Sequence, residues 1–265
     1  MTQSFYEGKA ALYDHGVNQV VRDAVLGALP PGGRVLDVGC GSGGLLSTLG
    51  GRAGHRAGVE LSATAAAAAS AVADEVVNLP VDTDLPFAPA SFDVVVCADV
   101  LEHLPDPVAV LTSLVGLCRP GGAFVVSVPN VANWQARLRL LRGDWRYEPV
   151  GLFDSGHLRF FTRATLLELV TGCGLTVESC RPARQPPLTV QLPSVARWPA
   201  PLGRLAGKGW SVTGYGLSRV WPGLFAYQLV CTAQPGRAAG GRGRDPRSTS
   251  RSVRRTRPRR RSRSA

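Results

Sequence analysis

The feature that most constrains this chain is the run from Val35 to Gly44, in which an apolar stretch is followed by four glycines. The apolar stretch predicts a short buried strand, and the glycines predict a tight turn that leads into a helix. Because glycine has no Cβ, a ligand can approach the backbone of such a turn closely. The following helix start offers free N–H groups and a positive dipole end. We therefore expect a small-molecule pocket at this turn.

Strands and helices alternate around this run. Apolar stretches that predict strands are separated by segments with apolar residues at helical spacing. This alternation is typical of an α/β fold with a parallel, doubly wound sheet, in which ligands bind beyond the carboxyl ends of the strands. The predicted strands are 34–38, 56–60, 75–77, 92–98 and 123–128, and the predicted helices include 17–29, 63–73 and 107–117.

The second half of the chain predicts fewer regular elements. We expect a helix over 131–142, an aromatic-rich loop over 143–161 and a helix that follows Thr162 as its N-cap. Strands over 175–179 and 225–233 would complete a seven-stranded sheet, with the last strand inserted antiparallel. Between these two strands lies a segment rich in Pro, Gly, Trp and Arg. We expect 182–224 to include a lid over the pocket, with peripheral contact to a membrane as the alternative.

The charge of the chain is concentrated at its C-terminal end. Residues 236–265 contain 12 Arg and one acidic residue, which accounts for the whole net charge of +11, whereas residues 1–235 are balanced. We therefore expect one domain over 1–235 and a disordered basic tail over 236–265. Such a tail can contact nucleic acid or anionic lipid weakly and by charge alone. A tail that only aids solubility is an equal alternative.

The six cysteines form no CxxC pair and are irregularly spaced, which favours buried thiols over a disulfide framework or a zinc site. The start of the chain lacks the apolar run of a signal peptide, and no stretch is long and apolar enough to predict a membrane span. We expect a cytoplasmic location. The sequence does not predict an oligomeric state.

The glycine turn also matches a known phosphate- and nucleotide-binding pattern. Gly39, Gly41 and Gly44 satisfy GxGxxG, and Glu60 follows about 20 residues later at the end of the next predicted strand. An acidic residue at this place can bind the two hydroxyls of a ribose. These features alone fit NAD, FAD or S-adenosylmethionine, and a tight turn without a ligand is the remaining alternative.

Four segments of the chain resemble, in the same order, the motifs of class I S-adenosylmethionine-dependent methyltransferases. The resemblance is greatest to the bacterial members called methyltransferase types 11 and 23. The four segments are Val35–Gly43, Gly58–Ser62, Leu85–Leu104 and Leu117–Gly122. The resemblance covers roughly residues 10–180 and implies a Rossmann-like fold of seven strands. It also implies S-adenosylmethionine as the methyl donor.

The resemblance assigns roles to individual residues. Glu60 would bind the ribose, Leu61 would pack on the adenine, and Asp82 would contact the adenine amino group. Counting back along the chain from Leu85 places the position of this adenine contact at Val81 rather than at Asp82. The alternative is that Asp82 is a solvent-exposed acidic residue of the loop. The residues implied at the methionine end and beside the donor are Asp37, Gly39, Cys40, Gly41, Ala98 and Asp99.

A second group of residues points to chemistry on the acceptor. Asp99, Glu102 and His103 would face one site if a helical turn begins there, and His157 comes from the later loop. This set is similar to the metal site of small-RNA 2′-O-methyltransferases and to residues of ubiquinone-biosynthesis O-methyltransferases. His103 and His157 are therefore candidate catalytic bases, and all four residues are candidate ligands of a divalent metal, although we do not expect one. A structural role is the remaining alternative.

These observations predict transfer of a methyl group to a hydroxyl of a small-molecule, glycan or lipid-linked acceptor. The alternatives are a metal-assisted RNA 2′-O-methyltransferase and a non-catalytic protein that binds S-adenosylmethionine. Polar and aromatic residues of the later loops are the candidate walls of an acceptor pocket. They are Asn130, Trp134, Trp145, Tyr147, His157 and Arg159.

Overall fold

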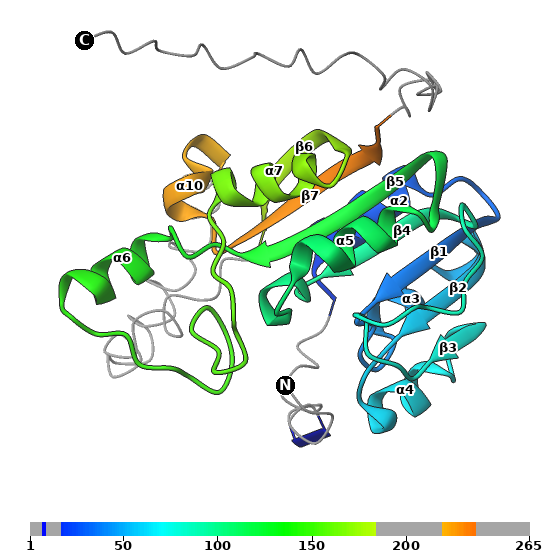
Figure 1. Ribbon diagram of the computed structural model, residues 1–265, viewed down its shortest axis with the longest axis horizontal. Helices are drawn as coiled ribbons and strands as arrows, with labels where there is room; N and C mark the ends of the chain where they lie inside the picture. The colour runs from blue at the N-terminus through cyan, green and yellow to red at the C-terminus, as the bar shows by residue number, and fades with distance from the viewer. Residues whose placement is uncertain (1–6, 9–16, 184–218, 237–265) are drawn as a thin grey trace, which may run out of the picture.

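The computed structural model describes residues 7–8, 17–183 and 219–236, and Figure 1 shows their arrangement. The predicted tail over 236–265 lies outside the described residues apart from Gly236. Most of the predicted lid segment, 184–218, lies outside them as well.

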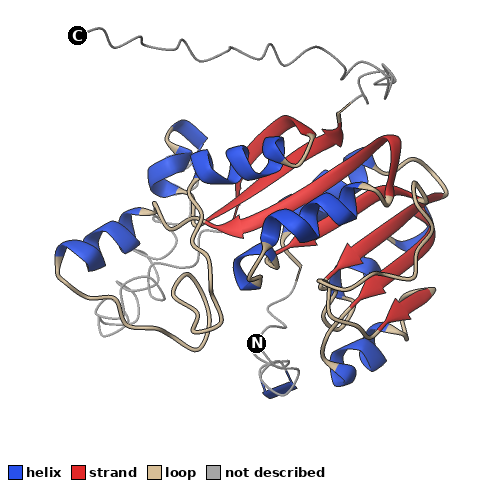
Figure 2. Cartoon of the chain, viewed as in Figure 1, coloured by secondary structure: helices blue, strands red, loops and turns tan. Residues whose placement is uncertain are grey.

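One sheet of seven strands forms the centre of the structure, in the order β3-β2-β1-β4-β5-β7-β6 (Figures 1 and 2). Neighbouring strands from β1 to β5 are parallel, and β7 pairs antiparallel with both β5 and β6. This confirms the predicted fold class, including the antiparallel last strand. The strands are β1 (Gly33–Val38), β2 (Ala53–Val59), β3 (Glu75–Val77), β4 (Phe92–Ala98), β5 (Cys118–Pro129), β6 (Leu175–Ala183) and β7 (Gln228–Pro235).

Helices cover both faces of this sheet, and most begin at a capping side chain. Asn18, Ser62, Asp106 and Thr162 each accept a hydrogen bond from a backbone N–H in the first turn of the helix that follows. The helices are α2 (Gln19–Ala28), α3 (Gly44–Ser47), α4 (Ala63–Ala69), α5 (Pro107–Val115), α6 (Trp134–Leu141), α7 (Arg163–Gly172) and α10 (Pro222–Phe225). Two 3-10 turns, Gly50–Arg52 and Leu101–His103, join them.

Alternate residues of the central strands pack on opposite faces of the sheet, as a strand covered on both sides requires. In β4, Val95 and Cys97 belong to the same apolar cluster as Leu111 of α5 and Leu166 of α7. The other face carries a second cluster, in which Val94 and Val96 of β4 lie with residues of α2, α3 and α4. Two apolar layers therefore hold the sheet rigid beneath its carboxyl ends.

The final strand begins three residues later than the sequence predicted, because Phe225 belongs to the short helix α10. The side-chain amide of Asn130 donates to the carbonyl of Ala226 at 2.9 Å, and that of Asn133 donates to the same carbonyl at 3.0 Å. Both amides therefore stabilise a turn where apolar residues alone suggested a strand.

Other boundaries differ for local reasons. Strand β5 starts at Cys118 rather than Ala123, because Cys118 pairs with Phe92 before a register shift. Helix α4 ends at Ala69, four residues before the predicted end.

The cysteines are free, and all except the half-buried Cys180 are buried, as expected for small apolar side chains. Among the residues that the structure describes, no helix has both the length and the apolar character needed to cross a membrane.

Candidate active site

A cavity of about 880 Å³ opens at the carboxyl ends of the parallel strands. Its volume lies within the usual range for small-molecule sites. All nine residues expected at the cofactor line it, namely Asp37, Gly39, Cys40, Gly41, Glu60, Leu61, Asp82, Ala98 and Asp99. Val81, the alternative to Asp82, lines it too. Glu102, His103 and His157 line the same cavity.

The glycine turn lies where β1 meets β2 and β4. The backbone N–H groups of Gly39 and Cys40 both donate to the carbonyl of Val59, at 2.8 and 3.0 Å. Gly39 has φ +75°, and a Cβ at this position would lie 2.5 Å from Cγ2 of Val100. Only glycine fits this backbone without strain, so the turn is closed on one side and open toward the cavity.

Glu60 holds the turn from the end of β2. One carboxylate oxygen accepts from the N–H of Gly41 at 2.9 Å, and the other accepts from the N–H of Ser62 at 2.8 Å. The amide of Asn78 donates to the carbonyls of Glu60 and Leu61, at 2.8 and 3.0 Å. These bonds fix a carboxylate at the cavity wall, where it can accept further bonds from a ligand's hydroxyls.

Asp37 lies at the bottom of the cavity and is only 4% exposed. Burial, together with the nearby charge of Glu60, raises the pKa of Asp37 to about 7. A cationic group of a ligand beside this carboxyl would favour its ionised form. The cradle is therefore suited to a ligand that combines a positive charge with a ribose.

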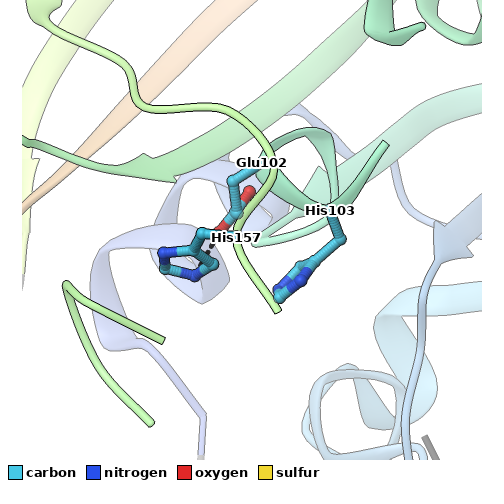
Figure 3. Close-up of side chains that lie close together, drawn as sticks. All are labelled: Glu102, His103 and His157. Carbon is cyan, nitrogen blue, oxygen red and sulfur yellow. Dashed lines mark ion pairs between the residues drawn. The ribbon is translucent and has the colours of Figure 1, made fainter. Parts of the chain in front are cut away.

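A second group of side chains lines the same cavity, and Figure 3 shows them close together. Glu102 and His103 lie on the 3-10 turn after β4, and His157 lies on the loop after α6. One ligating atom from each of the three lies within 4.8 Å of the others. The N–H groups of Leu158 and Arg159 donate to the carbonyl of Glu102 at 2.8 and 3.0 Å, so the loop is attached to the turn.

Hydrogen bonds to the backbone determine which ring nitrogens carry a proton. Nδ1 of His103 lies 2.9 Å from the carbonyl oxygen of Gly156, and Nδ1 of His157 lies 3.3 Å from that of Leu152. A carbonyl only accepts, so each Nδ1 is the donor. In the neutral rings Nε2 then carries the lone pair, which is the form needed in a base or a metal ligand.

Glu102 is buried, with 1% of its surface exposed, and its carboxylate oxygens accept no hydrogen bond from another of the described residues. Burial and the charge of Asp99 raise the pKa of Glu102 well above its usual value. Nε2 of His157 lies 4.0 Å from Oε1, which is too long for a hydrogen bond. Glu102 is therefore a polar group that a ligand in the cavity can satisfy.

The structure does not bring Asp99 into this cluster. Asp99 precedes the 3-10 turn with φ +57°, in the left-handed region, and its Oδ1 accepts from the side chains of Ser127 and Gln228. The expected grouping of Asp99 with Glu102 and His103 assumed a regular helical turn, which this backbone does not form.

Comparisons with known proteins agree with this geometry. Residues 13–180 match the profile of a methyltransferase domain family. A ubiquinone biosynthesis O-methyltransferase of Aeromonas salmonicida is 31% identical over 169 residues, which cover 60% of this chain and 70% of that protein. A protein of the same name from Xanthomonas campestris pv. campestris is 37% identical over 128 residues, and the chain spans about half of its length, 52%.

The chain belongs to the class I S-adenosylmethionine-dependent methyltransferases. A solved structure with a similar fold is the methyltransferase in complex with the Haloferax volcanii Trm112 methyltransferase activator. It has TM-score 0.61 and 18% identity, and the match covers 90% of this chain and 99% of that one. Another is Burkholderia thailandensis 1,6-didemethyltoxoflavin-N1-methyltransferase, which was solved with S-adenosylhomocysteine, at TM-score 0.55 and 19% identity over 88% of this chain and 84% of that one.

The residues present fit the cofactor of this methyltransferase. The glycine turn, the fixed carboxylate of Glu60 and the buried carboxyl of Asp37 together suit a cationic nucleoside. When bound, S-adenosylmethionine supplies an activated methyl group.

The expected walls of the acceptor pocket are mostly elsewhere. Of the six loop residues named for this role, only His157 lines the described cavity. Asn130 is fully buried and bonds to the backbone before β7, and Trp145 packs edge-on against Phe153 and Phe160. These residues support the loop that carries His157.

Sequence reasoning missed six polar residues of the cavity wall, namely Asn18, Thr64, Asn78, Asp154, Tyr227 and Gln228. A signal existed for two of them. Asn18 precedes a helical apolar pattern, as an N-cap does, and Gln228 is a polar residue within an otherwise apolar predicted strand.

We expect Gly39→Ala to weaken binding of S-adenosylhomocysteine by about tenfold or more, because the added methyl group must displace Val100 at the cavity wall. Gly32→Ala is the matched control. Gly32 also has positive φ, +71°, but nothing lies within 4 Å of its missing Cβ and it does not line the cavity. Isothermal titration calorimetry should show reduced affinity in the first variant alone, and equal affinities in both would contradict the assignment.

We expect Asp37→Asn to stabilise the cofactor-free protein above neutral pH. The folded-state pKa of Asp37 is about 7 against 3.8 ordinarily, so the folded wild type loses stability as pH rises between these values. The variant lacks this loss and should be more stable by about 2–4 kcal/mol above pH 7, with little difference near pH 4.

Denaturant unfolding at several pH values measures this difference. Asp23→Asn, which changes an exposed carboxylate on α2, is the control. A difference between Asp37→Asn and wild type that does not depend on pH would contradict the prediction.

Proposed function

We propose that this methyltransferase transfers the methyl group to a hydroxyl oxygen of a small-molecule, glycan or lipid-linked acceptor in the cytoplasm. The observation that carries the proposal is the pair of histidines on the cavity wall, whose Nδ1 atoms both face backbone carbonyls. A hydroxyl acceptor must lose its proton during methyl transfer, and a neutral imidazole can remove it. The names of the O-methyltransferase relatives support the same type of acceptor.

The reaction needs no covalent enzyme intermediate. S-adenosylmethionine held by the glycine turn, Asp37 and Glu60 would supply the methyl group, and Nε2 of His103 or His157 would take the proton of the acceptor hydroxyl. The contribution of the protein is to align these groups and exclude water. The glycine turn and the histidines line one cavity, which suits such an alignment.

The charge of the cavity supports an acceptor without negative charge. Six of its described wall residues carry carboxyl groups, namely Asp37, Glu60, Asp82, Asp99, Glu102 and Asp154, and none of the described wall residues is Lys or Arg. A phosphate or carboxylate of an acceptor would be repelled here. This argues against RNA as the acceptor, whose only support is the set of candidate metal ligands and the basic tail.

We expect His103→Asn and His157→Asn to lower the rate of methyl transfer by about 100-fold in at least one variant. Asparagine can still donate a hydrogen bond to the backbone carbonyl but lacks a basic nitrogen. The rate is measured with an uncharged hydroxyl acceptor found by screening phenols and sugars with labelled donor. His55→Asn is the control, since His55 lies on β2 beside Glu75 and does not line the cavity.

Affinity for S-adenosylhomocysteine should stay unchanged in these variants, which separates a loss of chemistry from a loss of folding. Normal rates in both variants would contradict the role of the histidines as bases.

A second candidate role for the same cluster is binding of a divalent cation. Glu102, His103 and His157 offer one carboxylate and two imidazole ligands, and within the described part of the chain no other residue donates to the carboxylate of Glu102. A bound cation would lower the pKa of an acceptor hydroxyl.

We expect methyl transfer to survive treatment with EDTA, because the two histidines can accept the proton without a cation. The measurement compares rates before and after chelation and after adding back Mg²⁺, Mn²⁺ or Zn²⁺. A loss of activity that one of these ions restores would instead establish the second role. Labelling of RNA in the same assay would support the RNA alternative.

A further inference from the structure

A chain of side-chain hydrogen bonds runs from the start of α2 through the beginning of β7 to the end of β4. It joins Asn18, Gln228 and Asp99, all of which line the cavity. Asn18 also caps α2, and the bonds among the three side chains link elements that lie far apart in the sequence. Buried polar networks of this kind define a geometry more than they add stability.

The direction of each bond in this chain is determined. The Oδ1 of Asn18 accepts from the N–H of Val20 at 3.0 Å, so its amide nitrogen faces Gln228 and donates to Oε1 at 2.6 Å. The amide nitrogen of Gln228 must then face Asp99, and it donates to Oδ1 of that carboxylate. Each amide in this chain therefore donates toward Asp99, from the helix N-cap Asn18 through Gln228 to the carboxylate.

Asp99 is held in place from three sides. Its backbone lies in the left-handed region at φ +57°, and its N–H donates to the carbonyl of Ser127 at 3.0 Å. The hydroxyl of Ser127 donates to Oδ1 at 3.1 Å, on the same oxygen that Gln228 binds. An uncommon backbone conformation at a cavity wall is typical of a functional position.

The position of Asp99 is between the cofactor cradle and the histidines. Cys97 pairs with Val38, so the chain leaves β4 beside the glycine turn, and Val100 occupies the space next to Gly39. Glu102 and His103 follow directly. Asp99 lines the same cavity as the glycine turn and the histidines, so a donor held by the cradle with its methyl group toward the histidines would have its sulfur near Asp99.

We propose that Asn18 and Gln228 are positioning residues that hold the Asp99 carboxylate against the sulfonium of S-adenosylmethionine. The donor's sulfur carries a positive charge, whereas the sulfur of the product S-adenosylhomocysteine is a neutral thioether. A fixed carboxylate at this place favours the donor over the product and promotes product release. The proposal rests on the cofactor and is independent of which acceptor is methylated.

The test is the ratio of the two dissociation constants, for S-adenosylhomocysteine and for S-adenosylmethionine, measured by calorimetry. We expect Gln228→Leu to weaken binding of the donor by about five- to tenfold and binding of the product by less than about twofold. A merely structural role would weaken both ligands equally, so the ratio separates the two explanations.

Asn18→Asp is the second variant and keeps the fold intact. Asp caps a helix as well as Asn does, but it has no donor for Gln228, whose amide must then turn its oxygen toward Asp99. The ratio should fall here as well. Gln19→Leu is the matched control, because the amide of Gln19 bonds only to the exposed Arg22 in the described structure.

A fall of the ratio in Gln228→Leu and Asn18→Asp, with no change in Gln19→Leu, would support the proposal. An unchanged ratio in either of the first two variants, or equal losses for both ligands, would overturn it. Loss of binding in Gln228→Leu through misfolding leaves Asn18→Asp to decide, with its thermal unfolding midpoint as the check on folding.

Discussion

The parallel pairing of β1, β2 and β4 brings their carboxyl ends to one edge of the sheet, and the rest of the site depends on this arrangement. Asp37 and Glu60 come from β1 and from the end of β2, and Asp99 from the end of β4, so three acidic side chains meet in one cavity. The apolar layers on both faces keep these strands from separating under the repulsion. A rigid sheet thus makes an acidic cavity possible in a domain whose overall charge is balanced.

Burial of these carboxyl groups, together with their mutual repulsion, has an energetic cost in the empty protein, visible in the raised pKa values of Asp37 and Glu102. The cost is useful because the methyl donor is a cation. A site that is unfavourable for its own carboxylates becomes more favourable when a positively charged ligand enters, so part of the binding energy comes from relief of repulsion.

Features set by local sequence were predictable, and those set by distant contacts were not. The glycine turn, Glu60 and the N-caps follow from residues within one strand–turn–helix unit. Gln228 and Asn18 act across 129 and 210 residues of sequence, which no periodic pattern reveals. The expected helical turn does not begin at Asp99, whose backbone is left-handed, although Asp99 and Glu102 line the same cavity.

The antiparallel insertion of β7 has a consequence for chemistry as well as for topology. A strand that runs against its neighbours begins where they end, so the first residue of β7, Gln228, pairs with Pro129 at the last residue of β5. A parallel strand in the same place would bring its carboxyl end to the cavity and its first residue to the opposite edge. The antiparallel direction therefore lets an amide from the last strand reach a carboxylate of β4, which connects the two halves of the sheet at the point where methyl transfer would occur.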